Sequence, residues 1–398
     1  MSKLEELIAE LCPDGVKYKE LWEVTIWDKR FNAVDNNKQP RIIKYPSLLA
    51  KDLFALEQKD GDVFLLSTGE QTGWTTEAVA GDKLCKGEVV SIPWGKSRAV
   101  KDVMKYYKGK FVTADNRIAT SSDVDTLLNK YLYYWMMTQS DIIDSFYRGS
   151  GLKHPSMKDV LDMKIPVPPI EVQNEIVRIL DNFTELTAEL TAELTAELTA
   201  RKKQYEYYRK ELLTFADDVK KVPLIDVVKI KRGVRVVKSQ LAVEGEYPVF
   251  QNSMTPLGYM DKANCTGDTA FIITAGAAGE IGYTDNDFWA ADDCFSFECP
   301  QYLKSKYLYY ILLCQKNTIY SKVRKASIPR LPRSAIEKLI IPVPNVDIQE
   351  KIVDVLDRFD TLCNDISKGL PAEIEARQKQ YEYYRDKLLT FKESSDEN

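Results

Sequence analysis

Histidine and cysteine are scarce in this chain. Its 398 residues include one histidine, His154, and seven cysteines that lie far apart, with Cys294 and Cys299 as the closest pair. A structural zinc site needs four Cys or His ligands at short spacing, so we expect no metal site. A general base or a Ser-His-Asp triad would depend on His154 alone, and we expect no catalytic residue. The cysteines are expected to be reduced residues of the core.

Several enzyme signatures are also missing. No P-loop and no glycine-rich dinucleotide fingerprint occurs. The glycine-rich run at 274–282 lacks the Lys-Ser/Thr pair of a P-loop, so a tight β-turn is favoured over a phosphate cradle. Pro13-Asp14 begins like a nuclease motif but no acidic-x-Lys triplet follows it at useful spacing. Val167-Pro-Pro-Ile170 lacks the acid or amide and the aromatic residue of a DNA-methyltransferase motif.

Long hydrophobic runs are absent as well. No apolar stretch is long enough to cross a bilayer, and no signal peptide is recognisable. We therefore expect a cytoplasmic protein that makes no contact with a membrane.

What the chain does contain is a duplication. The segment RKKQYEYYRKELLTF at 201–215 returns at 377–391 with changes only at positions 202, 210 and 211 of the first copy, an offset of 176 residues. Upstream, IPVP at 165–168 matches 341–344 at the same offset. A weaker match pairs Val16-Lys17 with Val219-Lys220 at an offset of 203. A period this long predicts two copies of a domain rather than a solenoid.

The near-identical segments have the pattern of long helices. The first begins after Pro168-Pro169, and its apolar residues recur every three or four positions from Ile176 to Leu198 and reach Leu212 and Phe215. About 45 residues would make a rod of roughly 68 Å, which needs a partner, and the second copy is the obvious one. The second copy contains Gly369-Leu370-Pro371, so we expect a kink or break there.

A tandem repeat lies inside the first helical segment. The tetrapeptide TAEL occurs three times over residues 187–198. Each unit would lengthen an α-helix by about 6 Å and add a net rotation of about 40°. The block is either a spacer of adjustable length or a solvated helix of low complexity.

The segments between the helices differ in sequence. They contain short β-branched and aromatic runs such as 61–66, 88–92 and 271–274, and helices are expected at 125–147 and 303–322. We predict an α+β fold with two globular mixed α/β domains, joined by two long antiparallel helices in a coiled-coil-like spacer with pseudo-two-fold internal symmetry.

The charge distribution favours an anionic partner for these domains. The net charge is −5, yet residues 16–164 and 222–340 each carry three more basic than acidic residues. Basic residues cluster around 229–238 and 322–333 in the second domain and around 96–110 in the first. A clustered basic bias can bind phosphate, although any single run could be an ordinary solvated surface.

Taken together, the TAEL block and the duplicated KQYEYYR segment resemble the specificity subunit of type I DNA restriction-modification systems. The resemblance covers the whole chain. It implies target recognition domains that each read one half of an asymmetric bipartite sequence in double-stranded DNA. It also implies docking of two methyltransferase subunits, which hold S-adenosylmethionine, and of restriction subunits that use ATP and Mg where they are present. The implied parts are a first target recognition domain (1–163), a first spacer helix (164–216, TAEL repeats 187–198), a second target recognition domain (217–340), and a second spacer helix and tail (341–398).

Candidate DNA contacts are polar residues on turns that could reach a groove or a phosphate. In the first domain we predict Thr68, Gln71, Trp74, Lys96, Ser97, Arg98, Arg148, Lys153 and His154, with Glu70 and Trp94 on the same turns. In the second we predict Arg232, Arg235, Gln251, Asn252, Ser253, Thr274, Arg324, Lys325 and Arg330. Arg148 and Arg324 occupy matched positions, which favours a shared phosphate anchor. The counterpart of His154 is Arg330. Each residue could instead be an ordinary exposed polar side chain.

Two other classes of protein remain as alternatives. A coiled-coil adaptor would hold proteins together and never bind DNA. A stand-alone methyltransferase or nuclease would need the catalytic motifs that are missing. The sequence favours a non-catalytic DNA-specificity subunit over both.

Overall fold

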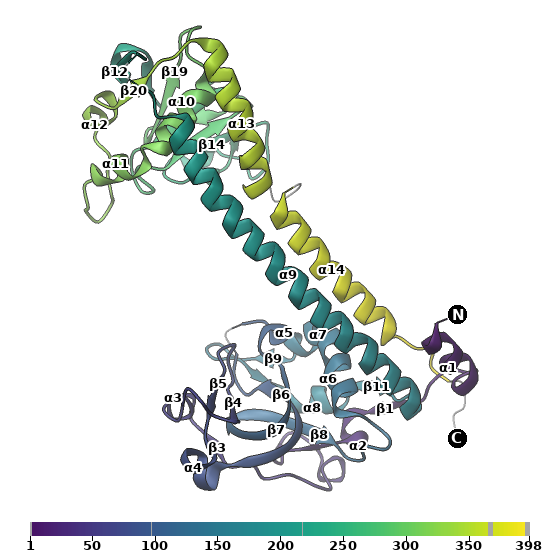
Figure 1. Cartoon of the computed structure of the whole chain (residues 1–398). Helices are drawn as coiled ribbons and strands as arrows, with labels where there is room; N and C mark the ends of the chain where they lie inside the picture. The colour runs from purple at the N-terminus through teal and green to yellow at the C-terminus, as the bar shows by residue number, and fades with distance from the viewer. Residues whose placement is uncertain (1, 97, 217, 365–368, 395–398) are drawn as a thin grey trace. The chain divides into compact units, whose positions relative to one another are not determined.

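The computed structural model describes residues 2–96, 98–216, 218–364 and 369–394 (Figure 1). The chain divides into two compact units. The first unit contains Met1–Thr191 and Ala376–Asn398, and the second contains Ala192–Glu375. Two helices, α9 (Ile170–Leu212) and α14 (Leu370–Leu388), contribute residues to both units.

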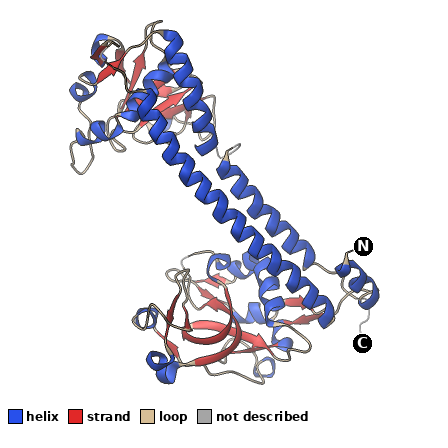
Figure 2. Cartoon of the chain, viewed as in Figure 1, coloured by secondary structure: helices blue, strands red, loops and turns tan. Residues whose placement is uncertain are grey.

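The first unit is built on a seven-stranded mixed sheet, coloured red with the other strands in Figure 2. Its strand order is β2-β8-β6-β7-β4-β5, and β3 pairs with β7. β7 runs parallel to β3 and β4, and the other pairs are antiparallel. The strands are β2 (Thr25–Trp27), β3 (Ser47–Leu48), β4 (Val63–Leu66), β5 (Gly73–Thr75), β6 (Cys85–Pro93), β7 (Lys105–Ala114) and β8 (Asn116–Ser121). Two short antiparallel pairs join β1 (Tyr18–Glu20) to β11 (Lys164–Pro166) and β9 (Tyr147–Arg148) to β10 (His154–Pro155).

Short helices and turns surround this sheet. They are α1 (Lys3–Leu11), α2 (Leu21–Val24), α3 (Ala50–Phe54), α4 (Glu77–Ala80), α5 (Val100–Val103), α6 (Asn129–Thr138), α7 (Ser140–Ser145) and α8 (Met157–Leu161), with 3-10 turns η1 (Asn36–Lys38) and η2 (Gly81–Lys83). The main core joins strand residues such as Ile92 to α6 residues such as Tyr131 and to Leu180 of α9. The first half of α9 is therefore part of the core of this unit.

The second unit has a four-stranded antiparallel sheet in the order β13-β19-β16-β17 and a three-stranded sheet in the order β15-β14-β18. Its strands are β12 (Lys221–Pro223), β13 (Lys229–Arg232), β14 (Tyr247–Phe250), β15 (Tyr259–Met260), β16 (Thr269–Ile273), β17 (Ile281–Thr284), β18 (Trp289–Ala290), β19 (Cys294–Glu298) and β20 (Ile340–Pro342). Its helices and turns are α10 (Ser305–Cys314), α11 (Lys316–Ser321), α12 (Arg333–Glu337), α13 (Val346–Asn364), η3 (Leu224–Asp226) and η4 (Lys238–Gln240).

The two units share one strand topology. The order β2-β8-β6-β7 in the first unit corresponds to β13-β19-β16-β17 in the second. The long strand β7 also pairs in parallel with β4. In the second unit the corresponding parallel pair is formed by two other strands, β18 and β14. The antiparallel pairs β1–β11 and β12–β20 match at the offsets of 203 and 176 seen in the sequence. The predicted duplication of a mixed fold is confirmed.

Matched hydrogen bonds attach each unit to its helical segment. Gln173 of α9 and Gln349 of α13 are fully buried and 176 positions apart. The Gln173 amide donates to Pro168 O at 2.7 Å, and the Gln349 amide donates to Pro344 O at 2.8 Å. The sequence IPVP and the glutamine that follows it therefore recur because together they form one buried junction.

A tyrosine and an aspartate form a second matched contact. Tyr134 donates to Asp181 at 2.6 Å in the first unit, and Tyr310 donates to Asp357 at 2.5 Å in the second. Both tyrosines belong to the YLYY sequence that is common to α6 and α10. The duplicated tyrosines thus fix the helix of each unit against the helical segment.

The helical segments pair in the antiparallel sense within each unit. Phe183 of α9 stacks on Tyr384 of α14 with ring centroids 6.0 Å apart. In the second unit, Phe359 of α13 stacks on Tyr208 of α9 at 5.6 Å. These pairs are equivalent under the 176-residue offset, so the same aromatic contact is made twice.

The second helical segment is broken where the sequence predicts a break. α13 ends at Asn364, and α14 begins at Leu370, one residue after Gly369 and one before Pro371. Proline is tolerated in the first turn of a helix because that turn leaves its N–H groups without intrahelical partners. The predicted helices at 125–147 and 303–322 are each divided in two, because Gln139 and Gln315 leave the helical conformation.

Residues near both ends of the sequence meet in the first unit. The Val16 amide donates to Lys392 O at 2.8 Å, and the Ser394 amide donates to Val16 O at 3.0 Å. Among the helices of the described ranges, none has both the length and the apolar character needed to span a bilayer.

Candidate nucleic-acid interface

Two loops of the first unit meet around a hollow. One connects β6 to β7 and the other connects β9 to β10, and they are joined by a hydrogen bond from the Lys96 amide to Lys153 O at 3.1 Å. The hollow encloses about 900 Å³, including space open to solvent. It is lined by Lys96, Arg98, Ala99, Asp144, Gly151, Leu152 and Lys153. The structure therefore brings together three residues predicted as DNA contacts, namely Lys96, Arg98 and Lys153; the predicted Ser97 lies outside the described residues.

Most cations around this hollow are paired within the unit. Lys96 forms an ion pair with Asp144, and its ammonium group also lies 4.8 Å from the centre of the Tyr147 ring. Arg98 pairs with Glu70, and both side chains are exposed. DNA phosphates would have to compete with these carboxylates for the same cations.

Arg148 and His154 lie on the paired strands β9 and β10 beside this hollow. The two residues face each other across the strand pair, and Arg148 forms a 3.0 Å ion pair with Asp159. The His154 ring lies 4.1 Å from the Trp94 ring, and its Nδ1 is 2.9 Å from Trp94 O. His154 is thus engaged with a tryptophan that is itself 37% exposed.

The segment at 67–74, which ends within β5, carries the remaining predicted residues of the first unit. The Ser67 hydroxyl donates to Gln71 O within this segment, and the Lys105 ammonium of β7 donates to Ser67 O at 3.0 Å. These hydrogen bonds stabilise the conformation of the segment. Burial lowers the pKa of Lys105 to about 8. Trp74 is 44% exposed and packs edge-on against Phe64 at 5.4 Å. Gln71 is exposed and Thr68 is half-buried, outside the set of residues that line the hollow.

The second unit has a corresponding hollow of about 850 Å³, including space open to solvent. It is lined by Arg232, Thr274, Asp292, Asp293, Phe295, Arg324, Ala326, Ile328, Arg330, Leu331 and Pro332. The Arg324 amide donates to Arg330 O at 2.8 Å, and the Leu331 amide donates to Thr274 O at 2.8 Å. Four predicted residues, Arg232, Thr274, Arg324 and Arg330, thus converge on one hollow.

The two hollows occupy equivalent places in the repeated fold. Arg148 faces His154 across an antiparallel pair in the first unit, and Arg324 faces Arg330 across an antiparallel bridge in the second. Neither Arg324 nor Arg330 forms a side-chain ion pair with any residue in the described part of the chain. The two arginines of the second hollow therefore form no ion pair with a described residue, although Asp292 and Asp293 also line the hollow.

Thr274 belongs to the support of this hollow. It is 8% exposed, and its hydroxyl donates to Asp293 O at 2.9 Å. The glycine-rich run that follows it connects the antiparallel strands β16 and β17, with Gly276 and Gly279 at φ of 76° and 95°. The expected tight turn is confirmed, and its glycines adopt backbone conformations that other residues rarely take.

The other predicted residues of the second unit lie apart from the lining. Asn252 O accepts a hydrogen bond from the Ala277 amide at 2.9 Å, and this contact places the loop containing Gln251 and Ser253 against the glycine-rich turn. Arg235 and Lys325 are exposed. Sequence reasoning missed the acidic residues of both hollows, Asp144, Asp292 and Asp293, because it searched for basic clusters. The sequence FVTAD at 111–115 resembles FWAAD at 288–292, and this similarity was the available signal for Asp292.

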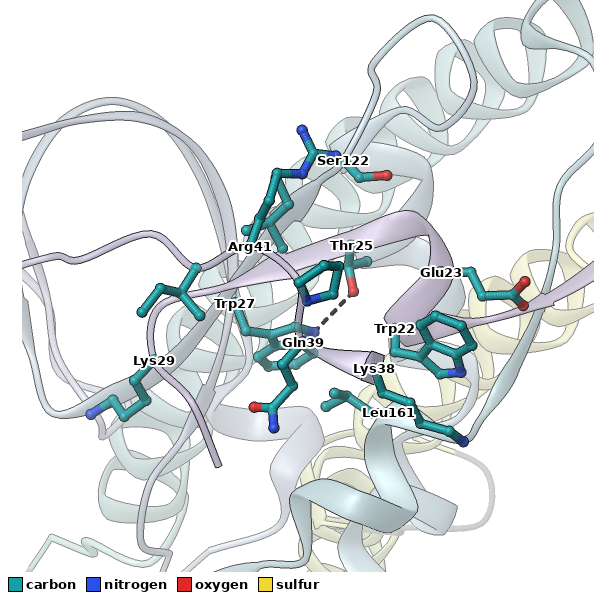
Figure 3. A pocket seen from close by; sticks show the side chains of 13 residues that line it. Trp22, Glu23, Thr25, Trp27, Lys29, Lys38, Gln39, Arg41, Ser122 and Leu161 are labelled. Carbon is teal, nitrogen blue, oxygen red and sulfur yellow. Dashed lines mark hydrogen bonds between the residues drawn. The ribbon is translucent and has the colours of Figure 1, made fainter. Parts of the chain in front are cut away.

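A further hollow of the first unit is lined by residues that include Trp22, Lys38 and Gln39 (Figure 3). Lys38 forms ion pairs with Asp162 at 2.6 Å and with Glu20 at 3.1 Å, and its ammonium lies over the Trp22 ring. The buried Gln39 amide donates to Val34 O at 2.9 Å. These contacts hold the loop that contains Lys38 and Gln39 against the rest of the unit.

Comparisons with known proteins agree with this geometry. The family described as the type I restriction modification DNA specificity domain matches residues 51–200 and 216–376. A type I restriction enzyme specificity subunit of Haemophilus influenzae is 34% identical over 327 residues, which cover 77% of this chain and 83% of the relative. The EcoR124I/EcoR124II specificity subunit of Escherichia coli is 33% identical over 307 residues, covering 69% of this chain and 74% of the relative.

Solved structures share the fold. The S subunit of a type I restriction-modification system from M. genitalium matches with a TM-score of 0.56 at 17% identity, covering 94% of this chain and 96% of that one. A chain from a type I R-M system studied for complex assembly and conformational transition matches with a TM-score of 0.64 at 15% identity, covering 95% and 98%. The relatives give no support to a coiled-coil adaptor that does not bind DNA.

Proposed function

Because the chain belongs to the family of type I restriction-modification DNA specificity subunits, we propose that its two hollows bind the two halves of a bipartite DNA target. As a specificity subunit, the chain recognises DNA and assembles with modification subunits. The observation that carries the proposal is the recurrence of one basic hollow at equivalent places of two units that differ in sequence. Two equivalent but different readers select two different half-sites.

Phosphate contacts come first in this proposal. Arg324 and Arg330 project from a two-residue bridge, and an arginine fork suits a phosphate. Arg148 occupies the matched place in the first unit but exchanges its partner Asp159 for phosphate when DNA binds. Base contacts come from the polar side chains nearest these anchors, among them Lys96, Lys153 and Arg232.

The chain acts without catalysis of its own. Methyl transfer from S-adenosylmethionine belongs to the modification subunits, and cleavage with ATP and Mg belongs to restriction subunits where they are present. We infer a cytoplasmic location, because its DNA target and these partners are found there. We propose recognition domains at 1–163 and 217–340 and helical segments at 164–216 and 341–398 as the functional parts.

The TAEL block sets the length of the gap between the half-sites. Residues 187–198 lie within the continuous helix α9, so each added or removed unit changes helix length by about 6 Å. The block contributes no polar cluster of its own to either hollow. Its role is therefore separable from base reading.

Single-molecule methylome sequencing tests the proposal. A host that lacks other methyltransferases would express this chain together with its modification subunit. We expect methylated adenine or cytosine within a motif of two different halves separated by a gap of fixed length. Methylation at a short continuous motif would refute two separate readers, and no methylation above the partner alone would refute DNA recognition by this chain.

A further inference from the structure

Asp292, an acidic residue of the second hollow, has a buried carboxylate oxygen without a hydrogen-bond donor. Asp292 lies between β18 and β19, is half-buried and lines the hollow together with Arg232, Arg324 and Arg330. Its Oδ1 is buried and accepts no hydrogen bond from any described residue. The Arg232 Nε donates to the backbone oxygen of Asp292 at 3.1 Å and leaves the carboxylate free. A carboxylate in such a place is expected to have a donor.

The equivalent carboxylate of the first unit has two donors. Asp115 lies between β7 and β8 at the place that Asp292 occupies in the second unit. Its Oδ1 accepts from the Lys29 ammonium at 2.7 Å and from the Arg117 guanidinium at 3.2 Å. In the first unit, cations of the same unit thus neutralise this carboxylate.

Strand register identifies what replaced those donors. Arg117 faces Ile92 of β6, and in the second unit Cys294 faces Ile273 of β16 at the equivalent rung. Trp27 faces Ala119 in the first unit, and Lys231 faces Ser296 at the equivalent rung of the second. Counting two residues on from each, Gly233 takes the place of Lys29. Both cations have therefore been replaced by uncharged residues, while the carboxylate has been kept.

Asp292 lines the hollow and its carboxylate accepts no hydrogen bond from a described residue, so a group that enters the hollow can donate to it. Phosphate has no hydrogen to offer and would be repelled by a carboxylate. Among the bases, cytosine presents only an N4 amino donor in the major groove, and aspartate or glutamate is its matching acceptor. Adenine presents N7 as an acceptor beside its amino group, which a carboxylate would face unfavourably.

We propose that Asp292 reads the N4 amino group of a cytosine in the half-site bound by the second unit. This inference rests on the proposed function of the hollow. Arg324 and Arg330 hold the DNA backbone beside it, so the carboxylate is brought to a base edge despite the phosphate charge. The first unit, whose equivalent carboxylate is paired with Lys29 and Arg117, reads its half-site without this contact.

The first test compares methylomes of the assembled complex carrying Asp292→Asn or Asp115→Asn. Asparagine can pair with adenine N6 and N7, so Asp292→Asn should reduce the preference for cytosine at one position of one half-site by about tenfold and admit adenine there. The other half-site and the gap should not change. Asp115→Asn should leave the entire motif unchanged, because its carboxylate faces Lys29 and Arg117 inside the first unit.

A second measurement uses the unmodified protein and so does not depend on variant folding. Each cytosine of the motif is replaced in turn by N4-methylcytosine, which removes the amino hydrogen that faces the major groove. One such replacement, in the second half-site, should weaken binding by about tenfold. A bipartite motif with no cytosine whose amino group matters, or an unchanged preference in Asp292→Asn, would overturn the role of Asp292 alone. Absence of any bipartite motif in the wild-type complex would overturn the proposed function instead.

Discussion

Removal of Arg324 and Arg330 should change the salt dependence of DNA binding in a way that can be calculated. Each phosphate contact adds about 0.9 to the slope of log binding constant against log salt concentration. The double variant Arg324→Ala/Arg330→Ala should therefore lower the slope by about 1.8. Between about 50 and 200 mM salt, the loss of affinity on adding salt should be about tenfold smaller than in the wild-type complex.

The matched control is Arg148→Ala in the first unit. Arg148 is already paired with Asp159 at 3.0 Å, so part of its favourable interaction is given up when it turns to phosphate. Removal of Arg148 should therefore lower the slope by less than removal of one arginine of the second hollow. Fluorescence anisotropy of the assembled complex, on duplexes with and without the methylated motif, measures both slopes. An unchanged slope in the double variant would refute the assignment of these arginines to phosphate.

Three further predictions follow from other parts of the chain. Deletion of Thr195–Leu198 should shorten the gap of the methylated motif and leave both half-sites unchanged, as methylome sequencing would detect; altered half-sites would contradict a spacer role. Gln349→Ala should lower the free energy of unfolding by about 3 kcal/mol, since it leaves the Lys304 amide and two backbone carbonyl groups without their partner at a buried junction. Calorimetry should record a much smaller loss for the control Gln380→Ala, because Gln380 is exposed. Ion pairs with Arg178 and Lys3 lower the pKa of Glu175 to about 2 from 4.5, so its contribution to stability is present above pH 4.5 and is lost as the pH falls toward 2. Thermal melts of Glu175→Gln should therefore lose less stability than the wild type over that range, and parallel curves would contradict the assignment.

The duplication made much of the fold predictable from one sequence. Gln173 and Gln349, or Tyr134 and Tyr310, stand out because the same buried junction is needed twice and each copy constrains the other. The break before Leu370 was predictable because Gly369 and Pro371 act locally on the backbone. The division of each predicted helix near 139 and 315 was not, because no proline or glycine marks it.

The candidate site was predictable in composition and less so in detail. Arg324 and Arg330 were found because basic residues cluster in sequence, and the antiparallel bridge then brings them together. The pairing of Lys96 with Asp144 depends on a contact across 48 positions, which no local pattern records. The missing donors of Asp292 are recognised only by comparison with Asp115, which accepts hydrogen bonds from two cations.

The pairing of Val16 with Lys392 and Ser394 has a topological consequence. In the second unit, the chain continues after α9 past Phe215 to β12 as one covalent backbone, whereas the first unit makes the same junction by hydrogen bonds between distant segments. The same junction is therefore covalent in one unit and non-covalent in the other. A circularly permuted chain, cut after Phe215 and joined from Ser394 to Ser2 by a flexible linker, would retain the strand pairs β1–β11 and β12–β20. Which recognition unit is translated first is thus a property of the gene and is not required by the fold.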